Sequence, residues 1–345
     1  MAPLPGLLLQ HAVDDVIATE RQTIAVCGND AWREVTALTG WEIPDAKSLP
    51  PDEKTCVLGA EIRHSAHDSE IDVAELRAET LREVVFIHIQ SKNLSAGASG
   101  KLYGRLSATT SQTHGRYGRA KLGPIKKRQY EHGMSHLTRQ LLSSLWWWYH
   151  GLANRVPRPV PFGALRRSDP IITYSDGEGG DAGVGVVIFG DFTHQPKPVY
   201  LEIPAELREL WSLQKNRSKT GATTDIFEIE AIGPLIALLE WPHLLANRPW
   251  IHFIDNVGAQ QALIKGSSNS LNGDVIAGIT WNYVRKVGCW LWLERVASAS
   301  NPIDGVSRKV WKCDPNIPPQ HQWSKVRRTK IPDAILKEIA QELRG

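Results

Sequence analysis

The stretch Ile171-Ile-Thr-Tyr-Ser-Asp176-Gly177 decides the fold of the second half of this chain. Its first five residues are apolar or favour strands, and an acidic residue stands where the predicted strand ends. The same pattern returns in Trp250-Ile-His-Phe-Ile-Asp255. Two strands that each end in a carboxylate predict that acidic side chains from distant positions meet at one edge of a sheet.

The sequence around these two stretches predicts an α/β domain. Further apolar runs predict strands over residues 184–189, 199–203 and 289–296. Helical spacing predicts helices over about residues 225–240, 257–265, 274–286 and 304–310. Gly179, Gly180 and Gly183 fit a tight hairpin between the first two strands.

Four acidic residues form the candidate site: Asp176, Glu230, Asp255 and Asp304. Glu230 lies in the predicted helix over 225–240, and Asp304 follows the last predicted strand. Hard divalent cations prefer carboxylate oxygens as ligands. Two Mg²⁺ or Mn²⁺ ions about 4 Å apart can activate water and neutralise the charge that develops when a phosphodiester is hydrolysed. The sequence therefore predicts a two-metal phosphodiesterase.

The helix that carries Glu230 also contains Pro234. The proline ring removes the backbone hydrogen bond to the carbonyl of Glu230, so we expect the helix to kink or to begin later than Asp225. Glu228 is the alternative ligand in the same segment. Glu230 is favoured because it shares a face with small residues that would let the helix lie close to the sheet.

A basic segment precedes this region. Residues 92–167 contain 14 Lys and Arg but one acidic residue, Glu131, whereas residues 1–91 contain 7 Lys and Arg and 16 Asp and Glu. Glycines and tyrosines are interleaved with the cations, a pattern typical of a surface that follows a phosphate backbone; the alternative is a solvated charged face. The candidate nucleic-acid-binding residues are Arg116, Arg119, Lys121, Lys126, Lys127 and Arg128.

The whole chain has 345 residues, 42% hydrophobic content and 22% charged content, which suits a globular protein of two domains. The Pro-rich and Arg-rich stretch at 155–163 indicates a domain boundary near residue 168. No apolar run is long enough to cross a membrane and no basic region precedes Gly6, so we expect an intracellular protein, with nucleus and cytoplasm both open. The four cysteines are scattered, which indicates neither a zinc site nor a disulfide framework.

The order of elements and acids over about residues 170–312 resembles the ribonuclease H domain of retroelement (retrotransposon) reverse transcriptases. The resemblance is carried by Tyr174-Ser-Asp176-Gly, by Glu230, by Phe253-Ile-Asp255-Asn and by Asn301-Pro-Ile-Asp304-Gly-Val-Ser-Arg308. It implies a ribonuclease H-like three-layer domain with a mixed five-stranded sheet. It also implies a magnesium-dependent endonuclease, a hydrolase that cleaves the RNA strand of RNA/DNA hybrids and reads the 2′-hydroxyls.

The resemblance also implies a role for each acid. Asp176 would bridge the two ions, Glu230 and Asp255 would hold the ion on the leaving-group side, and Asp304 would complete the ion that activates water.

Upstream, His11-Ala-Val-Asp14-Asp15 resembles the polymerase metal motif, although Ala12 replaces the family's aromatic residue. The resemblance implies three regions: a truncated palm end, thumb and basic connection at 1–168, a ribonuclease H-like domain at 169–312, and a basic C-terminal tail at 313–345. Only 13 residues precede Asp14, so we expect a vestigial polymerase motif at Asp14 and Asp15 and no DNA synthesis by this chain alone. Partners would be nucleic acid and the remaining polymerase or polyprotein segments.

Two alternatives stay open. In the first, the chain is a non-catalytic nucleic-acid-binding remnant of a retroelement polyprotein, in which the fold survives and the metal sites have decayed. In the second, it is another nuclease on the same fold, such as an exonuclease or a resolvase. Comparing metal-dependent cleavage of an RNA/DNA hybrid with cleavage of duplex DNA separates all three.

Overall fold

The computed structural model describes residues 8–12, 15–19, 25–40, 52–64, 68–161, 169–189, 197–218, 224–310, 323 and 325–344. The chain is a mixed α/β protein with two compact units. The first comprises residues 1–55 and 63–65, and the second comprises residues 56–62 and 66–345. The predicted borders near residues 168 and 312 both lie inside the second unit and stay predictions.

The first unit contains a hairpin of β1 (Leu8–Ala12) and β2 (Asp15–Thr19), followed by α1 (Ala25–Leu38). The strands pair antiparallel, with Ala12 opposite Asp15. Asp14 lies outside the described residues, and Asp15 is described through its backbone alone. The vestigial polymerase motif therefore stays a prediction.

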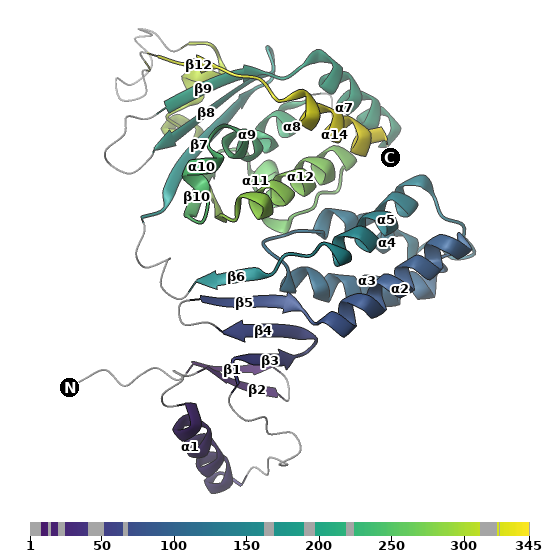
Figure 1. The fold of residues 1–345 in the computed structure, drawn as a ribbon. Helices are drawn as coiled ribbons and strands as arrows, with labels where there is room; N and C mark the ends of the chain where they lie inside the picture. The colour runs from purple at the N-terminus through teal and green to yellow at the C-terminus, as the bar shows by residue number, and fades with distance from the viewer. Residues whose placement is uncertain are drawn as a thin grey trace, which may run out of the picture. The chain divides into compact units, whose positions relative to one another are not determined.

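A helical bundle forms the N-terminal part of the second unit (Figure 1). Strands β3 (Lys54–Val57) and β4 (Ala60–His64) precede β5 (Asp68–Val73), which pairs antiparallel with β6 (Arg158–Pro161). Between β5 and β6 lie α2 (Glu75–Ser91), α3 (Ala96–Gln112), the 3₁₀ helix η2 (Arg119–Leu122), α4 (Gly123–Arg128) and α5 (Arg139–Ala153). Leu141, Leu145, Trp148 and Leu152 recur at helical spacing and are buried in the bundle core.

A six-stranded mixed sheet forms the centre of the C-terminal part, in the order β11-β10-β7-β8-β9-β12. The strands are β7 (Ile171–Glu178), β8 (Gly183–Phe189), β9 (Lys197–Glu202), β10 (Pro249–Ile254), β11 (Trp290–Arg295) and β12 (Arg327–Arg328). β7, β8 and β9 are antiparallel neighbours, whereas β10 is parallel to both β7 and β11. The predicted five strands are all present, and the expectation of a five-stranded sheet is corrected by the addition of β12, which pairs parallel with β9.

Helices cover one face of this sheet, and the four-residue helix α13 packs on the other (Figure 1). Side chains alternate along a strand, so Val184, Val186 and Ile188 of β8 face the large core while Val187 faces a smaller one. The larger layer contains α7 (Ala205–Ser218), α8 (Ile226–Ala231), α9 (Gly233–Glu240), α10 (Pro242–Leu245), α11 (Val257–Lys265), α12 (Leu271–Val287) and α14 (Asp333–Arg344). On the opposite face, α13 (Asp304–Ser307) follows η3 (Ser298–Ser300) and packs on β7, β8 and β9.

Two elements of this domain were not predicted as parts of the core. Helix α7 is rich in charged residues, and Leu207 and Trp211 are its buried anchors. Helix α14 buries Ile335, Ile339 and Leu343, at a spacing of four residues, and packs on α7 and α12. The interpretation of residues 313–345 as a basic tail is therefore corrected for residues 327–344, which complete the sheet and the core.

Among the described residues, no helix combines the length and the apolar character needed to cross a membrane.

Candidate metal centre

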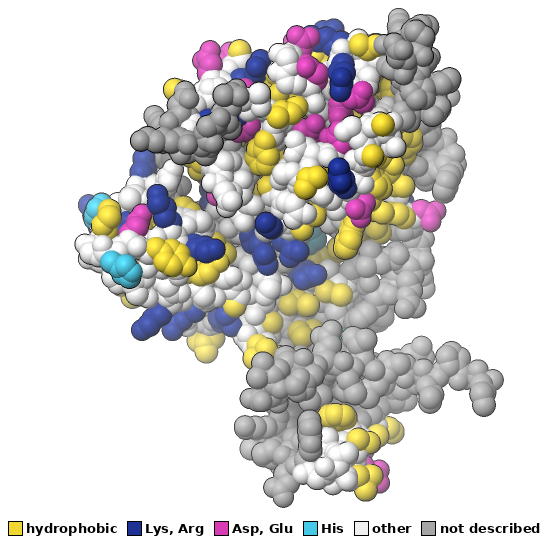
Figure 2. Space-filling model, turned by 180° about the vertical axis from the view of Figure 1, so that it is seen from behind, with side chains coloured by type: hydrophobic (Ala, Val, Ile, Leu, Met, Phe, Trp, Pro, Cys, Tyr) yellow, Lys and Arg dark blue, Asp and Glu magenta, His cyan; other side chains and the backbone are white. Residues whose placement is uncertain are grey.

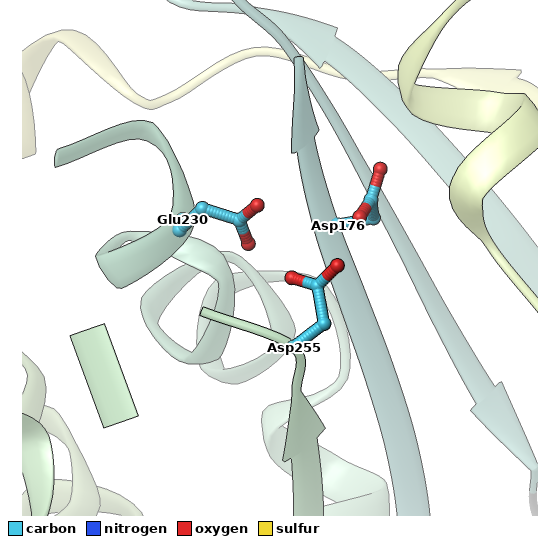
Figure 3. A group of neighbouring side chains, drawn as sticks. All are labelled: Asp176, Glu230 and Asp255. Carbon is cyan, nitrogen blue, oxygen red and sulfur yellow. The ribbon is translucent and has the colours of Figure 1, made fainter. Parts of the chain in front are cut away.

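Three carboxylates meet at one edge of the sheet (Figure 3). Asp176 lies near the end of β7, Asp255 follows β10 directly, and Glu230 projects from α8. Because β7 and β10 are parallel neighbours, their carboxyl ends lie at the same edge. One ligand oxygen from each of the three side chains lies within 4.8 Å of the other two. The structure thus brings together three of the four predicted acids.

Helix α8 carries Glu230 close to β7 because glycines leave room on both sides. A Cβ atom on Gly177 would lie 2.8 Å from Ile229 Cγ2 and 3.2 Å from the backbone nitrogen of Glu230. A Cβ atom on Gly233 would lie 2.2 Å from Ser175 Oγ. The distances of 2.8 Å and 2.2 Å are shorter than a real side chain tolerates, so glycine at these two positions permits the contact between helix and strand.

The predicted helix over 225–240 is divided, as Pro234 requires. Helix α8 ends at Ala231 and α9 begins at Gly233, with Pro234 in its first turn, where the missing N–H costs nothing. The break leaves α8 with six residues. This short helix presents Glu230 to the other two carboxylates.

Glu228 points away from this group. Residues two positions apart in an α-helix are separated by about 200° around its axis. Glu228 Oε2 lies 2.8 Å from Lys215 Nζ, and Glu228 Oε1 accepts a hydrogen bond of 2.8 Å from Asn272 Nδ2. Of the two candidate glutamates, Glu230 is the one that lies beside Asp176 and Asp255.

Hydrogen bonds fix the orientation of the Asp176 carboxylate. Ser307 Oγ donates to Asp176 Oδ2, and Asn301 Nδ2 lies 3.5 Å from Asp176 Oδ1 while it also donates to the Ser175 carbonyl at 3.0 Å. Both donors fall in the motif Asn301–Arg308, but the sequence alone did not assign them a role. Because this motif also contains the predicted site residue Asp304, its polar residues could have been recognised as candidates for contacts with the site.

Asp304 is not a member of the group of three. It opens α13, its carboxylate is partly exposed, and its Oδ1 accepts a hydrogen bond of 2.8 Å from Arg308 Nη2. Its negative charge still contributes to the raised pKa of Asp176, so it lies within electrostatic range of the cluster. The predicted four-acid site is therefore a group of three, with Asp176 and Glu230 buried and Asp255 half-buried, and with Asp304 beside it.

Among the described residues, no Lys or Arg forms an ion pair with these three carboxylates, and Arg308, whose charge acts on Asp176, is paired with Asp304. Burial raises the pKa of Glu230 to about 10, and the charges of Asp176 and Asp255 add to the effect. Burial also raises the pKa of Asp176 to about 7, although the hydrogen bond from Ser307 lowers it. Glu230 Oε2 is buried without a hydrogen-bond partner among the described residues. A hard divalent cation would satisfy all three groups at once, so this donor set fits Mg²⁺ or Mn²⁺.

The predicted nucleic-acid-binding residues divide into exposed and buried ones. Lys126 and Lys127 of α4 are exposed, and Figure 2 shows Lys and Arg side chains on the part of the surface that belongs to the helical bundle. Arg128 is 1% exposed and donates to the carbonyl of His136 at 2.7 Å. The assignment of Arg128 to a phosphate-binding surface is therefore corrected: this guanidinium stabilises the bundle.

Two further residues of the predicted set, Arg116 and Lys121, contact the sheet domain, and a third, Arg119, is half-buried. Arg116 Nε donates to the carbonyl of Ile264 at 2.9 Å, and burial lowers the pKa of its guanidinium. Lys121 forms an ion pair with Glu342 of α14. Arg119 is half-buried. Exposed cations that the prediction did not single out are Lys92, Lys101, Arg105 and Arg139.

No protein-family model matches this chain, and no curated protein matches it in sequence. Among solved structures, the chain is similar to a foamy viral protease-reverse transcriptase dRH in complex with double-stranded DNA, with 12% sequence identity and a TM-score of 0.37. The match covers 83% of this chain and 46% of that chain, so this chain spans less than half the length of its neighbour. A likeness at this level carries no functional weight, and function is inferred below from the carboxylates.

Proposed function

We propose that this chain is a metal-dependent phosphodiesterase of the ribonuclease H type, which hydrolyses the RNA strand of RNA/DNA hybrids at internal positions. The observation that carries the proposal is the group of buried Asp176 and Glu230 with half-buried Asp255, in which one ligand oxygen of each side chain lies within 4.8 Å of the other two. Carboxylates held this close and out of water need a cation to remain charged together.

When bound, two Mg²⁺ or Mn²⁺ ions would activate water and neutralise the negative charge of the transition state. Asp176, Glu230 and Asp255 would hold the ions, and Asp304 at the exposed start of α13 would complete the set. Ser307 contributes by holding one Asp176 oxygen, so the carboxylate presents its remaining lone pairs in a fixed direction.

The substrate class follows from charge and from the resemblance to retroelement ribonucleases H. Exposed cations of the helical bundle, such as Lys101, Arg105, Lys126 and Lys127, supply a surface for a phosphate backbone. Discrimination in favour of RNA would rest on contacts to 2′-hydroxyls in the wide minor groove of the hybrid.

A second candidate function is a non-catalytic nucleic-acid-binding protein. The observation that favours it is the hydrogen bond between Asp304 and Arg308, which holds the fourth acid outside the buried group. In that case the chain would bind nucleic acid through the bundle and would lack a complete second metal position.

The deciding experiment uses the full chain with an end-labelled RNA/DNA hybrid, duplex DNA and single-stranded RNA, each in Mg²⁺, in Mn²⁺ and in EDTA. We expect internal cuts in the RNA of the hybrid, dependent on the cation and lost in Asp176→Asn. Binding without cleavage in either cation would support the non-catalytic function, and cleavage of duplex DNA would support a different nuclease of this fold.

A further inference from the structure

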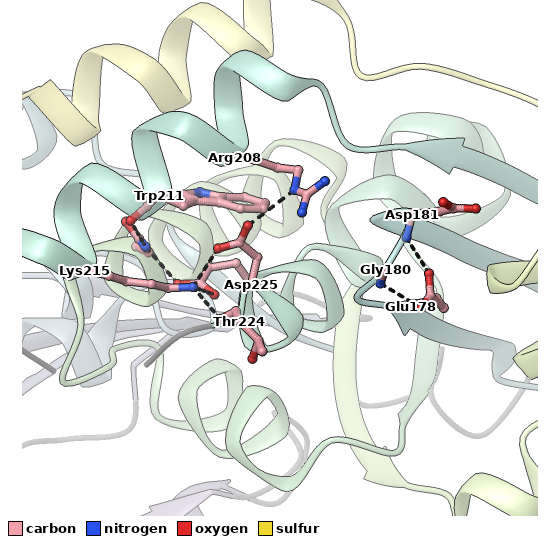
Figure 4. A network of polar contacts seen from close by, with 10 residues as sticks. Glu178, Gly180, Asp181, Arg208, Trp211, Lys215, Thr224 and Asp225 are labelled. Atoms are coloured by element: carbon pink, nitrogen blue, oxygen red, sulfur yellow. Dashed lines mark hydrogen bonds and ion pairs between the residues drawn. The ribbon is translucent and has the colours of Figure 1, made fainter. Parts of the chain in front are cut away.

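A buried ion-pair network joins α7 to Asp225 and to Glu228 of α8 (Figure 4). Lys215 Nζ of α7 donates to the carbonyl of Thr224 at 2.7 Å and to Asp225 Oδ1 at 2.8 Å, and it forms an ion pair with Glu228 Oε2 at 2.8 Å. The side chains of Lys215 and Asp225 are each 10% exposed, and that of Glu228 is 2% exposed. One ammonium therefore joins α7 to the residue before α8 and to α8 itself.

The network fixes the start of α8. The Asp225 carbonyl accepts the first hydrogen bond of the helix, from the Ile229 nitrogen at 2.9 Å. The Asp225 side chain forms no cap with its own helix; it accepts from Lys215 and, at 3.4 Å, from Arg208 Nε instead. Glu228 is also tied to α12 through Asn272. Helix α8 is thus held at its N-terminus by contacts with two other helices.

The orientation of α8 depends on these contacts because the helix is short. It contains six residues, and Ile232 separates it from α9, where Pro234 has no N–H to donate to the Glu230 carbonyl. Glu230 follows Glu228 by two residues and extends from the opposite side of the helix. A small rotation of α8 that relaxed the Glu228 contact would carry the Glu230 carboxylate away from Asp176.

We propose that Lys215 is a positioning residue for the metal centre: by holding Asp225 and Glu228, it sets the direction in which α8 presents Glu230 to the cation. This inference rests on the proposed function, since it requires a divalent cation at Asp176, Glu230 and Asp255. Buried ion pairs add little net stability but define geometry, because a buried charge that loses its partner is costly.

The test measures Mn²⁺ affinity by calorimetry in the full chain, without nucleic acid. Lys215→Met keeps the length of the side chain and removes its charge. We expect Mn²⁺ affinity to fall about tenfold or more, in the range typical for groups that support metal ligands. The matched control is Lys121→Met, which breaks the ion pair with Glu342, away from α8, and should leave Mn²⁺ affinity unchanged.

A double-mutant cycle with Glu230→Gln separates positioning from a general loss of structure. If Lys215 acts through Glu230, Lys215→Met should have no further effect on the residual Mn²⁺ affinity of the Glu230→Gln protein. An equal loss of affinity in both backgrounds, or an unchanged affinity in Lys215→Met alone, would overturn the inference.

A second variant covers the case in which Lys215→Met leaves the buried Glu228 carboxylate without an ion pair and does not fold; Asp225 keeps its contact with Arg208. Lys215→Met combined with Asp225→Asn and Glu228→Gln removes the ammonium and both carboxylate charges and leaves only Arg208, whose side chain is 38% exposed. We expect the same tenfold weakening of Mn²⁺ binding in a folded protein. Parent-like affinity in this triple variant would contradict the inference. If the parent itself bound no Mn²⁺, the proposed function would fail first and the role of Lys215 with it, whereas parent binding with no effect at Lys215 rejects the positioning role alone.

Discussion

Replacing Glu230 by Gln should stabilise the metal-free protein at alkaline pH, although it removes a ligand of the proposed metal centre. The pKa of Glu230 is raised from 4.5 to about 10 in the folded state. Between these values the unfolded chain releases its proton while the folded protein retains it, so the free energy of unfolding falls as the pH rises through this window. Gln has the same shape as protonated Glu and no proton to lose.

The magnitude follows from the size of the window. A pH of 8 is about 3.5 units above the pKa of Glu230 in the unfolded chain, and each unit corresponds to about 1.36 kcal/mol of unfolding free energy. The upper bound for the gain is therefore about 5 kcal/mol. Because Asp176 and Asp255 share the repulsion, we expect a measured gain of about 2 kcal/mol at pH 8 and close to none at pH 5.

The assay is urea unfolding in EDTA, with Glu230→Gln compared with the parent at the same pH. This pairing cancels the opposite effect of His252, whose pKa is lowered to about 3 by complete burial and which destabilises the folded state as the pH falls below 6.5. In saturating Mn²⁺ the order should reverse, because the parent gains binding free energy that the variant lacks. A gain that does not change between pH 5 and pH 8, or a loss at pH 8, would refute the reasoning. Glu228→Gln is the control, and it should lose stability at pH 8 because its partner Lys215 remains charged and buried.

Four further outcomes are expected. Asp176→Asn should lower the rate of hybrid cleavage more than about a hundredfold, because the carboxylate holds cations and not substrate. Its affinity for the hybrid in a filter-binding assay should stay within about threefold of the parent. Cleavage equal to that of the parent at saturating Mg²⁺ would reject the site. Lys126→Ala with Lys127→Ala should reduce the slope of log K against log salt concentration for nucleic-acid binding by about 2 and leave the free energy of unfolding unchanged. Arg128→Ala should instead lower the free energy of unfolding by about 3 kcal/mol, which chemical denaturation can check. Gly177→Ala should weaken Mn²⁺ binding about tenfold in calorimetry because its Cβ would push α8 off β7, and parent-like affinity would show that the close approach is dispensable.

The sheet and two of the site residues could be predicted because they depend on local pattern. Asp176 and Asp255 each close a run with strand character, and parallel strands place such residues at the same edge. Glu230 could be favoured over Glu228 because helical geometry separates the two side chains. The position of Asp304 outside the buried group depends on its contact with Arg308, a tertiary detail that no spacing specifies.

Charge composition was less informative than helical spacing in the basic segment. A run of cations indicates a polyanion-binding region but does not tell which side chains face inward. Arg128 follows Ile125 by three residues, on the same face of α4, and both are buried. The sequence contained that signal, and composition concealed it. In the same way, Ile335, Ile339 and Leu343 follow helical spacing in a segment whose basic residues suggested a tail.

Strand β12 has a consequence for solubility. It is two residues long, consists of Arg327 and Arg328, and occupies the outer edge of the sheet beside β9. Sheets avoid edge-to-edge aggregation by ending in short, charged strands of this kind. A fragment that stopped at residue 312 would uncover the backbone donors and acceptors of β9 and the apolar surface beneath α14. We expect this fragment to self-associate under conditions in which the chain that retains residues 325–344 stays monodisperse.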